Sequence, residues 1–193
     1  MNTEMKLSVT LFQGELVRLT AADPQTTAEA FSRWSRDSEY WRLLASDPCL
    51  PHSVKAIKQW LEKDQEKDPL PYTMFLIHTL EDDRLIGDIG LEGYLGSHGD
   101  TFVGIGLGER EYWGKGYGTD AMRIILRYAF FELNLERVSL DVFEYNPRAI
   151  RSYERAGFKH EGRLRGYLNR GGKRYDLIFM GILRAEWLEI YGK

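Results

Sequence analysis

The stretch Trp113–Ala121, which reads WGKGYGTDA, restricts the possible fold of this chain more than any other stretch. It places Gly114, Gly116 and Gly118 between an apolar run (VGIGLG) and a helical pattern (AMRIILRYAFFEL). Glycine is unfavourable inside a helix, but it adopts positive φ angles and lets a ligand approach the backbone. The stretch therefore predicts a strand, a glycine turn and a helix whose first N–H groups can bind an anion. A turn that binds nothing is the simpler alternative.

The composition indicates a single soluble globular domain over residues 1–193, with 43% hydrophobic and 28% charged residues. A formal charge of −3 gives no support for nucleic-acid binding. Cys49 is the one cysteine, so an intrachain disulfide is excluded and a reducing, cytoplasmic location is the simplest expectation. We expect no signal peptide, no membrane-spanning segment and no metal site.

The hydrophobic patterns predict an α/β or α+β chain, because runs of adjacent strands alternate with single crossover helices. Strands are expected over 15–21, 72–80, 84–95, 101–108, 137–145, 157–168 and 173–183. Helical segments are expected over 25–45, 53–67, 116–134 and 147–156.

A dinucleotide-binding loop is one reading of the glycines, since residues 116–121 match G-x-G-x-x-A and Asp141 or Glu144 follows at a suitable distance. The context does not fit that loop. Residues 109–115 separate the strand from the glycines, and the expected further βα units are missing. We therefore regard the dinucleotide match as weak.

Several blocks of this sequence together resemble the GCN5-related N-acetyltransferases (GNAT superfamily), in particular the RimJ/RimL-type branch. They are IGDIGL (86–91), EYWGKGYGTDAM (111–122), NPRAIRSYERAGFKHEGRLR (146–165) and the ending KRYDLIFMGILRAEW (173–187). The resemblance runs from about residue 16 to residue 187. It implies the GNAT fold, which is a mostly antiparallel sheet of about seven strands, flanked by helices and splayed between the fourth and fifth strands. It also implies an acetyl-CoA-dependent N-acetyltransferase.

The same resemblance implies a pyrophosphate-binding loop for CoA. Its residues here are Trp113, Gly114, Lys115, Gly116, Tyr117, Gly118 and Thr119. Trp113 stands where the family commonly has Gln or Arg. The pantetheine arm is expected to pair with the backbone of Ile105, Leu107 and Gly108. Arg148, Arg151 and Arg155 lie on or beside the helix that begins after Asn146, and any of them could approach a CoA phosphate. We place Arg151 first, although a solvated basic face is the simpler role for each arginine taken alone.

Asn146 and Tyr153 lie seven residues apart, which is two helical turns, so both side chains point along one helix face. Their role can be structural, with Asn146 as the N-cap before Pro147 and Tyr153 packed in the core. The resemblance implies instead that Asn146 bonds the pantetheine amide. It implies that Tyr153 protonates the departing thiolate as general acid.

The implied reaction is direct attack of a neutral amine on the acetyl carbonyl in a ternary complex, with a backbone N–H near Leu107 at the oxyanion. A base or a water path is then needed to take up the proton of the amine. Phe102 stands where many relatives carry Glu, so the base must come from elsewhere. Asp88 and Glu92 are four apart in a strand and share a face, and we place Glu92 ahead. A non-catalytic acyl-CoA-binding or regulatory module on the same fold is the alternative function.

The acceptor, a protein N-terminus or a small-molecule amine, is left open by the sequence, as is the choice between monomer and homodimer. The resemblance implies that the N-terminal helices roof the acceptor site. The aromatic side chains there either line that site or pack in the core. They are Trp34, Tyr40, Trp41 and Trp60.

Overall fold

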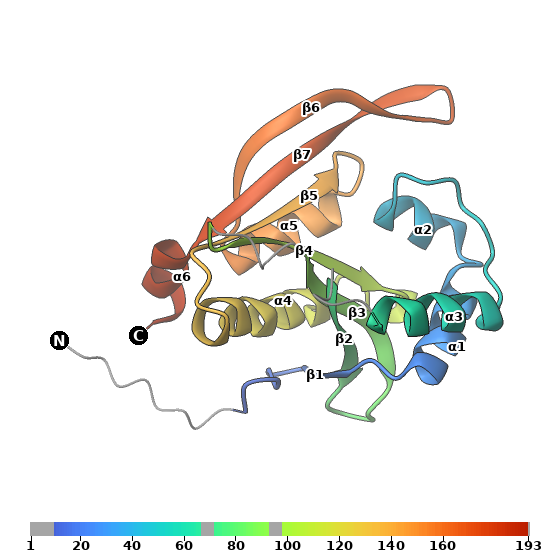
Figure 1. Ribbon diagram of the computed structural model, residues 1–193. Helices are drawn as coiled ribbons and strands as arrows, with labels where there is room; N and C mark the ends of the chain where they lie inside the picture. The colour runs from blue at the N-terminus through green and yellow to red at the C-terminus, as the bar shows by residue number, and fades with distance from the viewer. Residues whose placement is uncertain (1–9, 67–71, 93–97, 193) are drawn as a thin grey trace.

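The computed structural model, which describes residues 10–66, 72–92 and 98–192, contains one seven-stranded sheet of order β1-β2-β3-β4-β5-β7-β6 (Figure 1). The β4–β5 pair is parallel and the other neighbours are antiparallel. This confirms the expected mixed, mostly antiparallel α/β fold. The strands are β1 Val17–Ala21, β2 Tyr72–Thr79, β3 Leu85–Glu92, β4 Asp100–Leu107, β5 Arg137–Phe143, β6 Lys159–Arg170 and β7 Lys173–Leu183.

Helices cover both faces of this sheet. On one face, Ala28 of α1 packs with Ile57 and Leu61 of α3 against Met74 of β2. On the other face, the buried apolar side of α4 packs into the main core with β3 and β4. The helices are α1 Pro24–Trp34, α2 Ser38–Leu44, α3 Val54–Gln65, α4 Tyr117–Arg127, α5 Pro147–Ala156 and α6 Arg184–Tyr191.

Some expected elements have different bounds in the structure. The helical segment expected over 25–45 is two helices, because Asp37 accepts bonds from the backbone N–H groups of Glu39 and Tyr40 and so starts α2 anew. The helix expected over 116–134 ends as α4 at Arg127 and continues as a π-helical turn over 128–132. Helix α6 was not expected. The expected ends at 67 and 93–95 lie outside the described residues.

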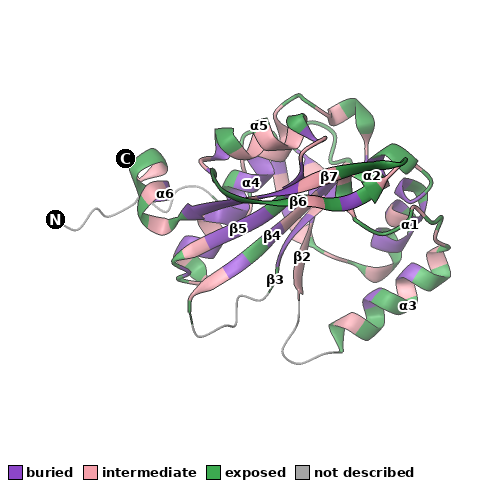
Figure 2. Ribbon diagram, turned by 90° about the horizontal axis from the view of Figure 1, so that it is seen from above, coloured by how far each residue is buried: buried purple, intermediate pink, exposed green. Residues whose placement is uncertain are grey.

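The sheet splays between β4 and β5, as the resemblance implied. The two strands pair only where Asp100–Phe102 lies beside Arg137–Ser139. Beyond that point β4 continues to Leu107 and β5 to Phe143 without pairing to each other. On the far side of β5, strands β7 and β6 form a hairpin whose β6 strand is mostly exposed (Figure 2). The opening between β4 and β5 is where the candidate site lies.

Candidate active site

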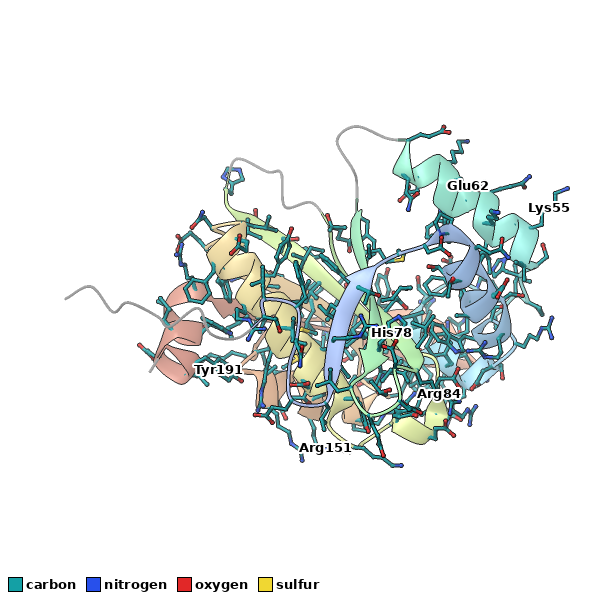
Figure 3. The ribbon with its side chains drawn as sticks, turned by 90° about the horizontal axis from the view of Figure 1, so that it is seen from below. Lys55, Glu62, His78, Arg84, Arg151 and Tyr191 are labelled. Carbon is teal, nitrogen blue, oxygen red and sulfur yellow. The ribbon has the colours of Figure 1, made fainter. Side chains whose placement is uncertain are left out.

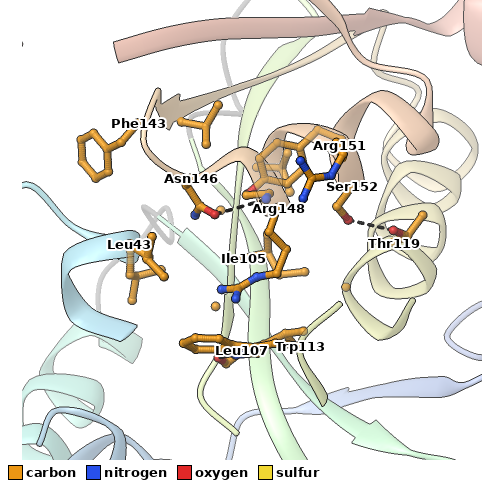
Figure 4. Close-up of a pocket in the computed structure, with 18 of the residues that line it drawn as sticks. Leu43, Ile105, Leu107, Trp113, Thr119, Phe143, Asn146, Arg148, Arg151 and Ser152 are labelled. Carbon is orange, nitrogen blue, oxygen red and sulfur yellow. Dashed lines mark hydrogen bonds between the residues drawn. The ribbon is translucent and has the colours of Figure 1, made fainter. Parts of the chain in front are cut away.

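A cavity of about 490 Å³ fills the opening between β4 and β5. The end of β4, the glycine loop, the start of α4, β5 and α5 all contribute to its wall (Figure 4). Helix α2 contributes as well, so the structure brings together residues as far apart in the sequence as Tyr40 and Arg155. The site residues predicted from the sequence that line this cavity are Glu92, Ile105, Leu107, Trp113, Gly114, Gly116, Gly118, Thr119, Asn146, Arg151 and Tyr153.

Gly108, Lys115 and Tyr117, which were also predicted to bind the cofactor, are not among the residues lining this cavity. A Cβ atom added at Gly108 would lie 2.0 Å from Trp34, so this glycine makes room for the indole. Its N–H donates to the carbonyl of Ile86 at 2.9 Å. The Tyr117 ring packs edge-on against a neighbouring tyrosine, and Lys115 is exposed.

The glycine loop has the geometry of an anion cradle. Gly114 and Gly116 adopt φ angles of +74° and +98°, which disfavour residues with a Cβ atom. Gly116 is the N-cap of α4 and supplies no side-chain bond to its first turn. By contrast α1, α2, α3 and α5 each begin with a capping Asp, Ser or Asn side chain. The first N–H groups of α4 are therefore free of a side-chain cap and suit a phosphate group.

Trp113 anchors this loop to β4. Its indole Nε1 donates to the carbonyl of Leu107 at 2.7 Å. The guanidinium of Arg148 lies 3.9 Å from the centre of the Trp113 ring, within cation–π range (Figure 4). The Trp113 side chain thus joins the end of β4 to the loop, and its ring holds the guanidinium of Arg148 beside the cavity. The carbonyl of Leu107 therefore already accepts one hydrogen bond within the protein.

One face of α5 lines the cavity with positive charge. Arg148, Arg151 and Arg155 all lie in its wall. Their spacing of three and then four residues places them along one side of the helix. All three were candidates from the sequence, with Arg151 placed first. Ser152 was missed, and its hydroxyl lies 2.8 Å from that of Thr119, which joins α5 to α4.

Asn146 and Tyr153 occupy the same wall. The Asn146 Oδ1 atom accepts the N–H of Ala149 at 3.2 Å, so the residue caps α5 as one reading of the sequence expected. Tyr153 packs against the main core while also lining the cavity. Burial, and then the charge of Asp141, raise the pKa of its hydroxyl above the ordinary value. Tyr153 therefore stays protonated near neutral pH and can donate.

On the face of β3 and β4 that points away from α4, two tyrosines occupy the space that glycines leave free. A methyl group added at Gly106 would lie 2.6 Å from Tyr40 Oη and 3.2 Å from Asp88 Oδ1. One added at Gly90 would lie 2.5 Å from Tyr72 Oη. Gly106 therefore makes room for packed neighbours in this part of the sheet.

The two carboxylates considered as base differ in surroundings. Asp88 lies opposite Gly106 in the sheet, and burial raises its pKa to about 7. Glu92 lies opposite Phe102 at the end of β3 and is exposed, although it lines the cavity. A carboxylate with a pKa near 7 has the basicity that proton transfer at neutral pH requires.

Within residues 10–66, 72–92 and 98–192, no group of three or more His, Cys, Asp or Glu side chains could hold a metal ion. In that same part of the chain, no helix has the length and apolar character needed to cross a bilayer.

Several known proteins that match this chain in sequence are named as acetyltransferases. A family model described as an acetyltransferase (GNAT) domain matches residues 15–159. The uncharacterized SPbeta prophage-derived N-acetyltransferase YokL of Bacillus subtilis (strain 168) is 31% identical over 182 residues, which cover 94% of this chain and 97% of YokL. YdaF of the same strain, provisionally named a ribosomal N-acetyltransferase, is 34% identical over 169 residues, covering 88% of this chain and 90% of YdaF.

Solved structures agree on the fold. Spermidine N-acetyltransferase from Vibrio cholerae, in a crystal structure with CoA and spermine, matches with a TM-score of 0.79 at 23% identity. The match covers 89% of this chain and 98% of that one. A GNAT-family acetyltransferase from Bacillus anthracis matches with a TM-score of 0.74 at 20% identity, covering 90% of this chain and 98% of that one.

Proposed function

This chain belongs to the GNAT acetyltransferase family, and on that premise we propose that it transfers an acetyl group from acetyl-CoA to a primary amine by direct attack in a ternary complex. The observation that carries the proposal is the cavity between β4 and β5, with the uncapped first turn of α4 at one end and Tyr153 in its wall. Acetyl-CoA is the co-substrate that GNAT acetyltransferases use.

The residues present fit the donor. The glycine loop offers backbone N–H groups to the pyrophosphate, and the arginine face of α5 offers positive charge to the phosphates. Ile105 offers backbone groups to the pantetheine arm, since β4 has no strand partner toward β5 there. The amide of Asn146 lies in the same wall and is placed to bond that arm.

Tyr153 is the general acid in this proposal. Its raised pKa keeps the hydroxyl protonated, so it can give a proton to the thiolate as the carbon–sulfur bond breaks. The place of Tyr153 in the cavity wall supports this role, whereas its core packing alone would be compatible with a structural one.

An amine acceptor is supported by the names of the relatives, among them an enzyme that acts on spermidine and one provisionally named for ribosomal N-acetylation. Membership of the RimJ/RimL-type branch is part of the proposal, and the 34% identity to YdaF supports it.

Titration of CoA into the protein, followed by thiol release from acetyl-CoA with a panel of amines, tests the proposal. We expect micromolar CoA binding and turnover on at least one amine. Tyr153→Phe should lower kcat about 100-fold and leave the CoA Kd unchanged. Tyr167→Phe, on exposed β6, is the matched control and should keep full kcat. CoA binding without turnover on any amine would favour a non-catalytic module, and absence of CoA binding would contradict the proposal.

A further inference from the structure

A second cavity, of about 420 Å³, lies between the N-terminal helices and β3. It shares Tyr40 and Leu44 with the first cavity, so the two are neighbours separated by side chains of α2. The residues lining it are Phe31, Trp34, Ser35, Tyr40, Trp41, Leu44, His52, Ala56, Ile57, Trp60 and Asp88.

The lining is mostly aromatic, and among the described residues that form it the indole N–H of Trp41 is buried without a hydrogen-bond partner. The hydroxyl of Ser35 donates to the carbonyl of Ser32 and accepts the N–H of His52. The indole Nε1 of Trp34 donates to Glu109 at 2.9 Å. The His52 ring packs against that of Trp41 at 5.6 Å. The Ser35 hydroxyl and the Trp34 indole are therefore committed to the protein, and a ligand meets mainly ring faces and aliphatic carbon.

Asp88 is the one carboxylate among the described residues that line this second cavity. It lies opposite Gly106 in the β3–β4 register, beside the strand that also walls the first cavity. A methyl group added at Gly106 would lie 3.2 Å from Asp88 Oδ1 and 3.3 Å from Leu44 Cδ1. The carboxylate, α2 and β4 therefore meet at the junction of the two cavities.

We propose that the second cavity binds the body of a small primary amine that carries an aromatic ring, and that Asp88 accepts a proton from its ammonium group. This inference rests on the function proposed above and names the acceptor class and the base for it. A cavity of this size suits a ligand of one or two rings. Aromatic walls bind such rings through apolar area and edge-to-face contacts.

The step is balanced as follows. One ammonium proton passes to Asp88 and later to solvent. The freed lone pair forms the nitrogen–carbon bond with the acetyl carbonyl. The carbon–sulfur bond then breaks and its electron pair stays on sulfur. Tyr153 protonates that thiolate, and the second proton leaving nitrogen restores Tyr153 through solvent. The products are the N-acetyl amine and CoA.

Other acceptor classes fit this cavity less well. A polyamine carries several positive charges, but a single carboxylate is found among the described lining residues. A peptide would bring a series of backbone N–H and C=O groups against a mostly aromatic wall, where the unpaired indole N–H of Trp41 could serve only one of them. An arylalkylamine carries one positive charge, which matches the single carboxylate. Its apolar body matches the aromatic side chains that line the cavity.

Asp88 is favoured over Glu92 by position. The two are four positions apart, which is about 13 Å along β3. Glu92 lines the first cavity near the paired end of β4, whereas Asp88 lies at the junction with the second cavity. The burial that raises the pKa of Asp88 to about 7 supports the choice. The titratable groups around it are Tyr40 of α2, Tyr72 of β2 and His52 in the same cavity, while α1 contributes neutral side chains.

Substrate preference is the first test. Thiol release is measured with phenethylamine, tryptamine, spermidine and a short peptide with a free N-terminus. We expect kcat/KM for the arylalkylamines to exceed that for spermidine and the peptide at least tenfold. Turnover with spermidine or the peptide preferred would overturn this inference and leave the acetyltransferase proposal intact. Absence of turnover on every amine, despite CoA binding, would count against the function proposed above as well.

Variants of the cavity provide the second test. Trp60 is 52% exposed at the cavity rim, so Trp60→Ala should raise KM for phenethylamine about tenfold with kcat and CoA Kd retained. Glu62, which projects from the outer side of the same helix, gives the matched control Glu62→Ala (Figure 3). Equal KM values for the wild type, Trp60→Ala and Glu62→Ala would show that the ring binds elsewhere.

The pH dependence of kcat tests the base. In the wild type, with chemistry limiting, activity should rise as pH increases through about 7 because the carboxylate must be ionised to accept the proton. Asp88→Asn should lower kcat about 100-fold and remove that rise, and Asp88→Glu should restore part of both. Retention of the rise in Asp88→Asn and its loss in Glu92→Gln would assign the base to Glu92 instead.

Discussion

At the residue scale, Asp88 has surroundings that oppose its charged form. Burial raises its pKa from an ordinary 3.8 to about 7, so the folded protein binds this proton more tightly than the unfolded chain does. The folded state is therefore favoured at low pH, and the advantage is lost as pH rises through about 7.

Asp88→Asn should therefore stabilise the protein at alkaline pH, where the wild type holds a buried charge. We expect the free energy of unfolding to rise by on the order of 2 kcal/mol at pH 8 and to change little near pH 4. Urea unfolding at the two pH values measures the difference. Asp83→Asn, in the exposed turn between β2 and β3, is the control. An equal change at both pH values would contradict the burial argument.

Single residues also show what the sequence could and could not predict. Most of the predicted cofactor contacts do line the cavity, because a glycine loop, an Asn-Pro start and helical spacing are local signals. Gly108 was predicted to contact the cofactor, but its lack of a side chain accommodates Trp34, which comes from a helix 74 positions earlier. Arg148 was placed behind Arg151, and its contact with the Trp113 ring, 35 positions away, was not predicted. Such contacts depend on tertiary packing, which spacing does not encode.

At the element scale, the junction between the glycine loop and α4 depends on backbone conformation. Gly114 has a φ angle of +74°, and an added Cβ would meet nothing within 4 Å. Gly114→Ala should therefore strain the backbone, which lowers the stability of the folded protein by about 1 kcal/mol. The strain should also displace the N–H groups of the cradle. We expect the CoA Kd to rise about tenfold, measured by calorimetry.

Gly171 provides a matched control for that variant. It has a φ angle of +60° in the turn between β6 and β7, and an added Cβ there is equally unobstructed. Gly171→Ala should cost similar stability and leave CoA affinity unchanged. If both variants weaken CoA binding equally, the effect is general strain and not loss of an anion cradle.

Arg170 joins the β6–β7 hairpin to the end of α2. Its guanidinium donates to the carbonyls of Arg42 at 2.6 Å and Ala45 at 2.9 Å, and to the hydroxyl of Tyr145 at 3.0 Å. Positive charge at a helix C-terminus is favourable, so this contact holds α2 in place. Since α2 carries Tyr40, the contact also bears on the proposed acceptor cavity.

Arg170→Ala should increase amide exchange over residues 42–47 and raise KM for the acceptor severalfold, with the CoA Kd retained. Hydrogen exchange and steady-state kinetics measure the two effects. Arg174→Ala is the control, because Arg174 donates to Gly166 within the hairpin itself. Unchanged exchange over 42–47 in Arg170→Ala would mean that α2 is held by its packing on β4 alone.

The helices and strands themselves were largely predictable from the periodic spacing of hydrophobic residues and from the residues typical of turns. All seven strands were expected, with their described ends within two residues, and the larger differences concern the helices. Asp37 divides the segment expected over 25–45, because its carboxylate bonds the next N–H groups and Arg110 pairs with it. Helix α6 was missed because the pattern was read as ending with the last strand. Its Trp187 is fixed by ring contacts with Phe130 and Phe131 from a distant segment.

At the scale of the whole molecule, the sheet consists of two parts that are joined by a short stretch of pairing between β4 and β5. Strands β1 to β4 form one part and β5, β7 and β6 the other, and they pair over three residues of β4. Helices α4 and α5 bridge the opening, where the hydroxyls of Thr119 and Ser152 meet at 2.8 Å. A ligand that fills the cavity contacts both parts at once, because residues of β4, α4, β5 and α5 all line it.

Saturation with CoA should therefore protect amide hydrogens on both sides of the opening and not only in the glycine loop. At 100 times Kd, a ligand specific for the folded state adds about 2.7 kcal/mol to global stability, so globally exchanging amides slow uniformly. Above that baseline, we expect extra protection over 103–107 of β4 and 140–143 of β5. Strand β1, at the far edge of the sheet, provides the internal reference. Extra protection confined to the first turn of α4 would mean that CoA is held by its phosphates alone and does not bridge the two parts of the sheet.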